Sequence, residues 1–382
     1  MPLAALSLAG RSIAERQLEL ALSLGCERIV CLSQGLDRSL LALQHRAEAA
    51  GAKFNLISGP RPLAGLVNAA DELVVIAEGL LPIANEAKEA LADNAGVLVL
   101  PVEPGVAAGF ERIDLNHAWA GVLAMPGGLV ERLSQLPPDC DTIASLLRIA
   151  LQGRVPERIL PERVLAEKDW LTITSVGQLA ELEPEWFRRH VAAPTPFAPG
   201  RGLALLAMRQ SGARLLERGW KPGFLSGCGV GLAGLGIAAA WLEQGIVGIA
   251  LCGVAWLLGE SASALRSISR AGLAGSQKPA PIATILDWLV DAAFVSIVAL
   301  SLAGPLAGRI FAPLVLLGLA RLVGRLVASR AAEIVQDRAV LALILALAAA
   351  GGVLLPAIQL LSLAFLILLL AFTRAETRIT QA

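Results

Sequence analysis

Two aspartates stand inside one long apolar run, in the sequence Ile-Leu-Asp287-Trp-Leu-Val-Asp291. Residues four apart lie on the same face of a helix. Carboxylates inside a membrane segment are costly, so they usually face a cavity or a counter-charge. The pair therefore has two interpretations. It is either a divalent-metal or proton-transfer site, or a structural ion pair with Arg321 and Arg325, which are also four apart.

A long polar connection precedes this run. It begins at Gly259-Glu260 and continues through Arg266 and Arg270 to Lys278, with several hydroxyl side chains between them. One acid and three cations beside two aspartates favour phosphate chemistry, while a solvated loop would have the same composition. We expect the candidate residues to line one polar cavity that is open to the cytoplasm, namely Glu260, Arg266, Asp287, Asp291, Arg321 and Arg325.

The composition places these residues in a membrane-embedded half of the chain. Hydrophobic residues make up 55% of the sequence and charged residues 17%, with a mean hydropathy of +0.66, which is too apolar for an ordinary soluble enzyme. Residues 222–382 hold only 10 Lys and Arg and 7 Asp and Glu, while residues 1–221 hold 22 and 25. The sequence therefore predicts two bodies joined end to end.

The second body contains six long apolar runs, which predict six membrane helices. Lys and Arg residues gather in the connections on one side of this even-numbered bundle, so both termini are expected in the cytoplasm. We therefore expect a multi-pass protein of the inner (cytoplasmic) membrane. The expected helices are 223–242, 244–258, 282–303, 306–328, 339–351 and 353–372.

The first body, residues 1–191, alternates short apolar runs with amphipathic stretches. This pattern predicts an α/β domain with a parallel-rich sheet. Residues 192–221 read as a Pro- and Gly-rich linker followed by a juxtamembrane helix. The expected strands are Leu3–Leu8, Arg28–Ser33, Phe54–Ser58, Leu73–Glu78, Val97–Val102, Trp119–Met125 and Leu171–Ser175, with helices near 11–24, 36–50, 83–93, 128–136 and 142–152.

The second body resembles the CDP-alcohol phosphatidyltransferase family, which has six membrane helices and the signature D-x-x-D-G-x-x-A-R-x8-G-x3-D-x3-D. Asp287-x3-Asp291 matches its final D-x3-D, and Arg266 matches its arginine. Lys221-Pro-Gly-Phe-Leu-Ser226 looks like the entry to its first helix. The resemblance implies transfer of a phosphatidyl or phospho-alcohol group from a CDP-linked donor to an alcohol acceptor, with release of CMP.

That family holds two metal ions on the donor pyrophosphate, and its last aspartate takes the acceptor proton. The resemblance therefore implies Mg²⁺ or Mn²⁺ on Asp287, Asp291 and Glu260, catalysis by Asp287 and Asp291, and donor contacts from Arg266, Arg321 and Arg325. This chain departs from the signature, because its two leading aspartate positions and first glycine position hold Leu258, Ser261 and Ala262.

The first body resembles the sugar-nucleotide type of nucleotidyltransferase, which has a GT-A-like Rossmann fold. The resemblance rests on the stretch from Ala9-Gly10-Arg11 to Val30. It implies that Gly10 and Arg11 hold a triphosphate through a short loop, and that Glu78, after a buried strand, ligates Mg²⁺. His117 has no Ser or Cys partner at a recognisable spacing and reads as a packed or surface histidine.

The leading expectation is therefore a membrane-embedded transferase of phospholipid or lipid-headgroup synthesis. Its partners would be membrane lipid, a CDP-linked donor, a small alcohol or phospho-alcohol acceptor and, as in related membrane domains, a second copy of the chain. The alternative is a non-catalytic relative that binds nucleotide or lipid and scaffolds other lipid enzymes. A transporter fits less well, because no internal repeat of broken helices is evident. The balance of 32 basic and 32 acidic residues argues against nucleic acid as a partner.

Overall fold

The computed structural model of the protein describes residues 3–33, 35, 38–82, 84–91, 95–270, 281–327 and 330–379. The chain divides between Glu183 and Pro184 into two compact units. We call them the α/β unit and the helical unit. The border falls inside helix α8 (Val176–His190), at the proline that this helix contains.

The α/β unit is built around a sheet in the order β10-β7-β9-β5, with β8 also paired to β9. Its longest strand, β9, is buried along most of its length. Side chains alternate between the two faces of a strand, and here both faces of β9 are apolar: Trp119 and Leu123 pack into one core, and Ala120 and Val122 into the other. The strands are β5 (Glu72–Ile76), β7 (Gly96–Pro101), β8 (Glu111–Arg112), β9 (His117–Pro126) and β10 (Glu157–Ile159).

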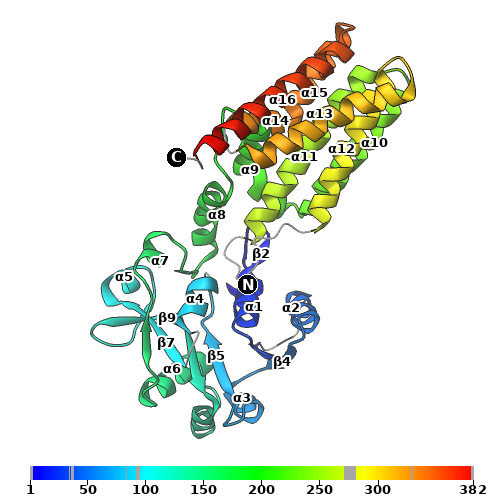
Figure 1. Ribbon diagram of the computed structural model, residues 1–382. Coiled ribbons are helices and arrows are strands. Elements are labelled where there is room, and N and C mark those ends of the chain that lie inside the picture. The colour runs from blue at the N-terminus through cyan, green and yellow to red at the C-terminus, as the bar shows by residue number, and fades with distance from the viewer. Residues whose placement is uncertain are drawn as a thin grey trace. The chain divides into compact units, whose positions relative to one another are not determined.

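Helices pack around the strands of this unit, and three two-stranded sheets accompany the main sheet (Figure 1). The helices are α1 (Ile13–Ser23), α2 (Arg38–Ala49), α3 (Pro60–Leu66), α4 (Ala84–Ala90), α5 (Val102–Ala107), α6 (Thr142–Gln152) and α7 (Arg163–Ala166), with 3₁₀ segments Leu3–Ala5 and Gly127–Gln135. The short sheets pair β1 (Ser7–Leu8) with β2 (Arg11–Ser12), β3 (Arg28–Leu32) with β4 (Lys53–Ile57), and β6 (Leu80–Leu81) with β11 (Leu171–Thr172).

The expectation of an α/β unit is confirmed, and the expectation of a parallel-rich sheet is wrong. Among the described strand pairs, only β10–β7 and β3–β4 are parallel. The strand β9 is antiparallel to β5, β7 and β8. A tight connection explains the pairing with β8, because the backbone N–H of Ile113 donates to the carbonyl of His117 and closes a hairpin.

The strand expected at Leu3–Leu8 is also mostly wrong. Leu3–Ala5 is a 3₁₀ turn, and only Ser7–Leu8 is extended. The chain reverses at Ala9 and Gly10, which have φ values of 54° and 77°. Two successive residues with positive φ form the tight turn of a hairpin, so β1 pairs back onto β2 instead of extending along the sheet.

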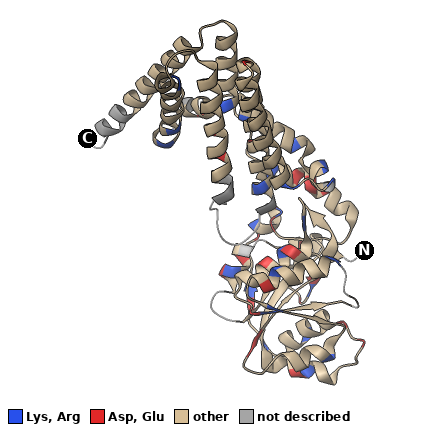
Figure 2. Ribbon diagram, turned by 90° about the vertical axis from the view of Figure 1, so that its right-hand side faces the viewer, with Lys and Arg blue, Asp and Glu red and all other residues tan. Residues whose placement is uncertain are grey.

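The helical unit contains long apolar helices that lie alongside one another (Figure 1). Figure 2 shows that charged residues are sparse along them. Five helices in the described residues are long and apolar enough to cross a membrane, which indicates a multi-pass membrane protein: 222–241, 245–268, 284–301, 306–326 and 354–372. They belong to α10 (Pro222–Trp241), α11 (Gly245–Arg270), α12 (Pro281–Ser301), α13 (Leu306–Leu326) and α16 (Leu354–Ile379).

The helix expected at 339–351 needs flanking residues to reach the length of a membrane span, and too few of them join it. The run expected at 339–351 forms α15 (Arg338–Ala350), whose 13 residues extend about 20 Å, less than a bilayer core of about 30 Å. It is preceded by the separate short helix α14 (Arg330–Gln336). The break falls at Asp337, whose side chain caps α15 by accepting from the backbone N–H groups of Ala339 and Val340.

Two glycines allow close contact between α10 and α11. A Cβ atom placed on Gly236 would lie 2.9 Å from the carbonyl oxygen of Gly248, and one on Gly248 would lie 2.7 Å from that of Gly236. Small residues at helix contacts in membranes allow backbones to approach in this way. Gly234, two residues away on α10, is exposed, and a Cβ atom placed there would have nothing within 4 Å.

We therefore expect Gly236→Ala to destabilise the helical unit and Gly234→Ala to leave it unchanged or slightly more stable. Alanine favours helix over glycine by about 1 kcal/mol at both positions, but at Gly236 the added methyl must displace backbone, a strain of about 1–3 kcal/mol. Thermal unfolding of the detergent-solubilised variants measures the difference. Equal shifts for the two substitutions would contradict this packing.

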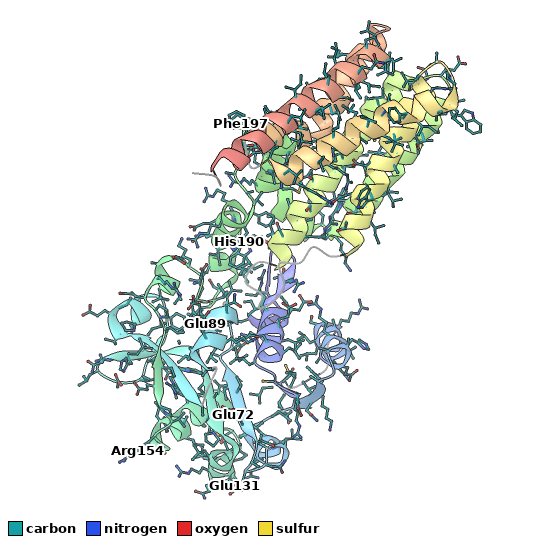
Figure 3. The ribbon with its side chains drawn as sticks, in the orientation of Figure 1. Glu72, Glu89, Glu131, Arg154, His190 and Phe197 are labelled. Carbon is teal, nitrogen blue, oxygen red and sulfur yellow. The ribbon has the colours of Figure 1, made fainter. Side chains whose placement is uncertain are left out.

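The segment expected to be a linker is fastened to the helical unit. Thr195 donates its hydroxyl to Glu333 at 2.7 Å. Helix α9 (Pro199–Glu217) follows, and the carboxylate of Asp337 accepts from the backbone N–H groups of Gly200 at 2.7 Å and Arg201 at 3.1 Å. One buried carboxylate thus caps the N-termini of both α9 and α15. Phe197, labelled in Figure 3, belongs to this entry segment.

We expect stability to fall in two steps when this shared cap is changed. An N-cap is worth about 0.5–2 kcal/mol, so Asp337→Ala should lose roughly 1–4 kcal/mol for the two helices together. Asp337→Asn keeps one carbonyl oxygen and can serve one helix, so it should fall between the wild type and Asp337→Ala. Unfolding curves of the three proteins provide the test, and an alanine variant as stable as the wild type would show that the cap contributes nothing.

Candidate functional site

A polar cavity of about 300 Å³ lies within the helical unit. It is formed by the start of α9 together with α11, α12, α13, α14 and α15. Its lining includes four arginines and five acids, which is unusual among such apolar helices. The lining residues are Ala198, Arg201, Trp256, Glu260, Asp287, Asp291, Arg321, Gly324, Arg325, Glu333, Gln336, Asp337 and Arg338.

Asp291 is the acid of this cavity that two arginines hold. Its Oδ2 accepts from Nε of Arg321 at 2.6 Å, and its Oδ1 accepts from Nε of Arg338 at 3.3 Å. The Asp291 and Arg338 side chains are 11% and 9% exposed, and that of Arg321 is 26% exposed. Each carboxylate oxygen therefore has its own guanidinium, so the buried negative charge is fully compensated.

Neighbouring groups fix the two arginines in place. The guanidinium carbon of Arg321 lies 3.7 Å from the ring centroid of Trp288, a cation–π contact that sets the plane of the guanidinium. Nη1 of Arg338 donates to the carbonyl of Val335 at 3.2 Å. The centre thus joins α12, α13 and α15 through one carboxylate.

Glu260, the acid expected in the polar connection, also has a basic partner. Glu260 lies on α11, which extends well beyond the predicted end of the second membrane helix. Its Oε2 is 3.1 Å from Nε of Arg201. The expected polar loop is therefore helical through Ser269 and Arg270, and the rest of it, up to Ala280, lies outside the described residues.

Asp287 and Arg325 have a different environment. Both are exposed and line the cavity, and neither has a hydrogen bond or ion pair with another residue in the described part of the chain. Asp287 is thus the one expected metal ligand there without a hydrogen bond or ion pair, although the positive charges of Arg266 and Arg321 lie close enough to act on it. Because Asp291 and Glu260 are engaged by arginines, the arrangement does not fit a divalent ion shared by the three carboxylates.

Five of the six residues expected at the cavity therefore come together: Glu260, Asp287, Asp291, Arg321 and Arg325. The sixth, Arg266, is not among the lining residues. Its Nη1 donates to the hydroxyl of Ser226 at 2.9 Å, which ties α11 to the start of α10. Arg321 is confirmed as the partner of Asp291, while the arginine expected beside it, Arg325, does not contact that carboxylate.

Sequence reasoning missed Arg338, Arg201 and Asp337 as site residues. Arg338 precedes an apolar run, and such a cation ordinarily marks a membrane interface. A signal was present in the pair Asp337-Arg338 itself, because an acid directly before a helix is a typical N-cap. This cap places Arg338 in the first turn of α15, close to the groups that the Asp337 carboxylate binds.

The nucleotide-binding residues expected in the α/β unit are not assembled into one described cavity. Gly10 occupies the two-residue turn between β1 and β2, and Arg11 forms an ion pair with Glu19. Glu78 follows β5 as expected and lines a separate cavity of about 330 Å³ with residues of α1 and β3. Neither Gly10 nor Arg11 is among the residues that line that cavity.

The α/β unit contains one side-chain cluster with metal-ligand geometry in its described residues. The ligand atoms of Asp114, His117 and Glu157 lie within 4.8 Å of one another. They are already joined, because Nδ1 of His117 is 3.2 Å from Asp114 Oδ2 and 2.9 Å from Glu157 Oε2. Backbone N–H groups of Asn116 and His117 lower the pKa of Asp114, which keeps that carboxylate charged.

Comparison with known proteins leaves the site to be judged on its geometry. No family model matches the chain. No curated protein matches it either.

Asp291, which two arginines contact directly, and Asp287, which has no such contact, should respond differently to substitution by asparagine. Asp291→Asn leaves two buried guanidiniums without their counter-charge, and we expect a loss near the lower end of roughly 3–5 kcal/mol, since Arg321 is partly exposed. Asp287→Asn, one turn earlier on α12, should change stability by less than about 0.5 kcal/mol.

Thermal unfolding measures both variants. Combining Asp291→Asn with Arg338→Met should recover part of the loss, because the second change removes one unpaired charge. If Asp287→Asn proved as damaging as Asp291→Asn, the two carboxylates would share a structural role that these contacts do not explain.

Proposed function

We propose that the helical unit is a membrane-embedded transferase of lipid-headgroup synthesis. It would move a phosphatidyl or phospho-alcohol group from a CDP-linked donor to an alcohol acceptor and release CMP. The observation that carries the proposal is the polar cavity, which gathers carboxylates and guanidiniums from six helices among otherwise apolar segments. Intramembrane ionisable residues that face a cavity are typical of functional sites.

The cavity residues suit the chemistry in different ways. The acceptor oxygen attacks the phosphorus of the donor, a new P–O bond forms, and the bond to the oxygen of CMP breaks. Asp287 is the residue to receive the acceptor proton, because the oxygens of Asp291 are engaged by Arg321 and Arg338. Guanidiniums at the cavity stabilise the negative charge that develops on phosphate oxygens. No step is assigned to a metal ion, since the carboxylates do not fit one.

The proposal includes a membrane arrangement. Helices α14 and α15 together would form one crossing between α13 and α16, with Asp337 at the break between them, which brings the number of crossings to six. An even number of crossings places both ends of the chain on one side. The Lys and Arg residues at the helix ends favour the cytoplasm for that side, in an inner membrane. The α/β unit would then be cytoplasmic, as a relative of the sugar-nucleotide type of nucleotidyltransferase with a GT-A-like fold, and the membrane units would pair as dimers.

A second candidate function is binding of the same ligand without transfer. It is favoured by a specific observation, the engagement of both oxygens of Asp291 by arginines. A carboxylate held in this way is a poor proton acceptor, and the site then depends on Asp287 alone. Such a protein would hold a nucleotide-linked lipid or headgroup and act as a scaffold for other enzymes.

CMP release distinguishes the two functions. Purified protein supplied with CDP-diacylglycerol and a set of polyol and polyol-phosphate acceptors should release CMP, and Asp287→Asn should lower the rate by about 10²–10⁴-fold, the usual contribution of a positioned base. Ser296→Ala, on the same helix but not among the cavity residues, is the matched control.

Donor binding without CMP release, for every acceptor, would favour the binding function. Absence of both binding and release would overturn the proposal.

A further inference from the structure

We propose that Arg321 and Arg338 bind the donor phosphate directly, so that the cavity takes a phosphate-bearing ligand without a divalent metal ion. This inference rests on the proposed function of the cavity, which it deepens by assigning what neutralises the ligand. It starts from the disagreement between the metal site that the D-x3-D spacing suggests and the contacts that Asp291 makes.

The first step is the direction of the hydrogen bonds. Both arginines use Nε to contact Asp291, and Arg338 uses Nη1 for the carbonyl of Val335. Both Nη atoms of Arg321 and Nη2 of Arg338 have no hydrogen bond to another described residue. These nitrogens are not among the buried atoms without a partner, and both arginines line the cavity. They are N–H donors available to a ligand.

The second step is charge. Arg321, Arg338 and Asp291 alone have a net charge of +1, and guanidiniums stay protonated under all ordinary conditions. The cavity lining as a whole has four arginines and five acids, so the positive charge is local to these three residues. Asp291 holds them together at low exposure, and Trp288 fixes the plane of Arg321. A planar, pre-oriented pair of guanidiniums matches the oxygens of a phosphate group, so little ordering is left for the binding step.

The third step is that the same centre opposes a metal ion. A divalent cation near Asp291 would compete with two guanidiniums for the same oxygens and would be repelled by both. The arginines therefore occupy the position at which a metal would neutralise the pyrophosphate. They supply the positive charge themselves.

Asp287 provides the sharpest test, because a metal site and a site made of guanidiniums predict opposite effects of Asp287→Asn on donor binding. In a metal site Asp287 is a ligand, and Asp287→Asn should abolish metal-dependent donor binding. In a guanidinium site Asp287 is a negative charge beside a bound phosphate. Removing that charge should leave the affinity unchanged or raise it.

The experiment measures the affinity of the full-length protein for CDP-diacylglycerol in detergent, and for inorganic pyrophosphate as a headgroup probe, in EDTA and in Mg²⁺. We expect binding to persist in EDTA and to be equal or tighter in Asp287→Asn. Arg321→Gln should weaken binding by about tenfold to a hundredfold, the loss of a charge-assisted hydrogen bond. Arg309→Gln, near the other end of α13, is the matched control.

Arg321→Gln also removes one partner of Asp291, so Arg321→Lys is included to retain the charge while losing the planar fork. Weaker binding by a folded Arg321→Lys supports the inference. Binding that requires Mg²⁺ and disappears in Asp287→Asn would overturn the inference while leaving the proposed function intact. Absence of donor and pyrophosphate binding in both conditions would overturn the two together.

Discussion

A charge that is buried among apolar helices needs an opposite charge or hydrogen-bond partners nearby. In this protein the adjacent residues Asp337 and Arg338 provide most of these contacts. Asp337 accepts backbone N–H groups from α9 and α15, and Arg338 extends to Asp291 on α12. Three segments that are far apart in the chain are therefore joined at one dipeptide. The polar cavity exists because these charges satisfy one another instead of separating into lipid.

The fold could be predicted where a local pattern decides the structure. The strands at Arg28–Leu32 and Gly96–Pro101 and the helix Thr142–Gln152 follow directly from apolar runs and from the Asp141 cap. Strand direction could not be predicted in this way, because it depends on which strands become neighbours. The apolar run at 339–351 was predicted to cross the membrane with the help of flanking residues, and the run itself does not reveal that the helix breaks at Asp337.

The candidate site could be predicted only in part, because helix spacing shows which residues share a face but not which partners they contact. A four-residue spacing of like charges inside an apolar run is a strong constraint, so Asp287 and Asp291 could be placed on one helix face and near Arg321. Which partner each acid takes depends on side-chain reach and on helices that are distant in sequence. Arg338 engages Asp291 from 47 positions away, and no spacing rule identifies such a contact.

The shared cap has a consequence for biosynthesis. The N-terminus of α9 depends on a carboxylate that lies 136 positions after Arg201 in the chain. A ribosome therefore releases α9 long before it has made the residue that completes this helix, and several apolar segments must enter the membrane in between. The earliest helix of the unit is among the last to be finished. During that interval the first amide groups of α9 lack the carboxylate that accepts from them in the folded protein.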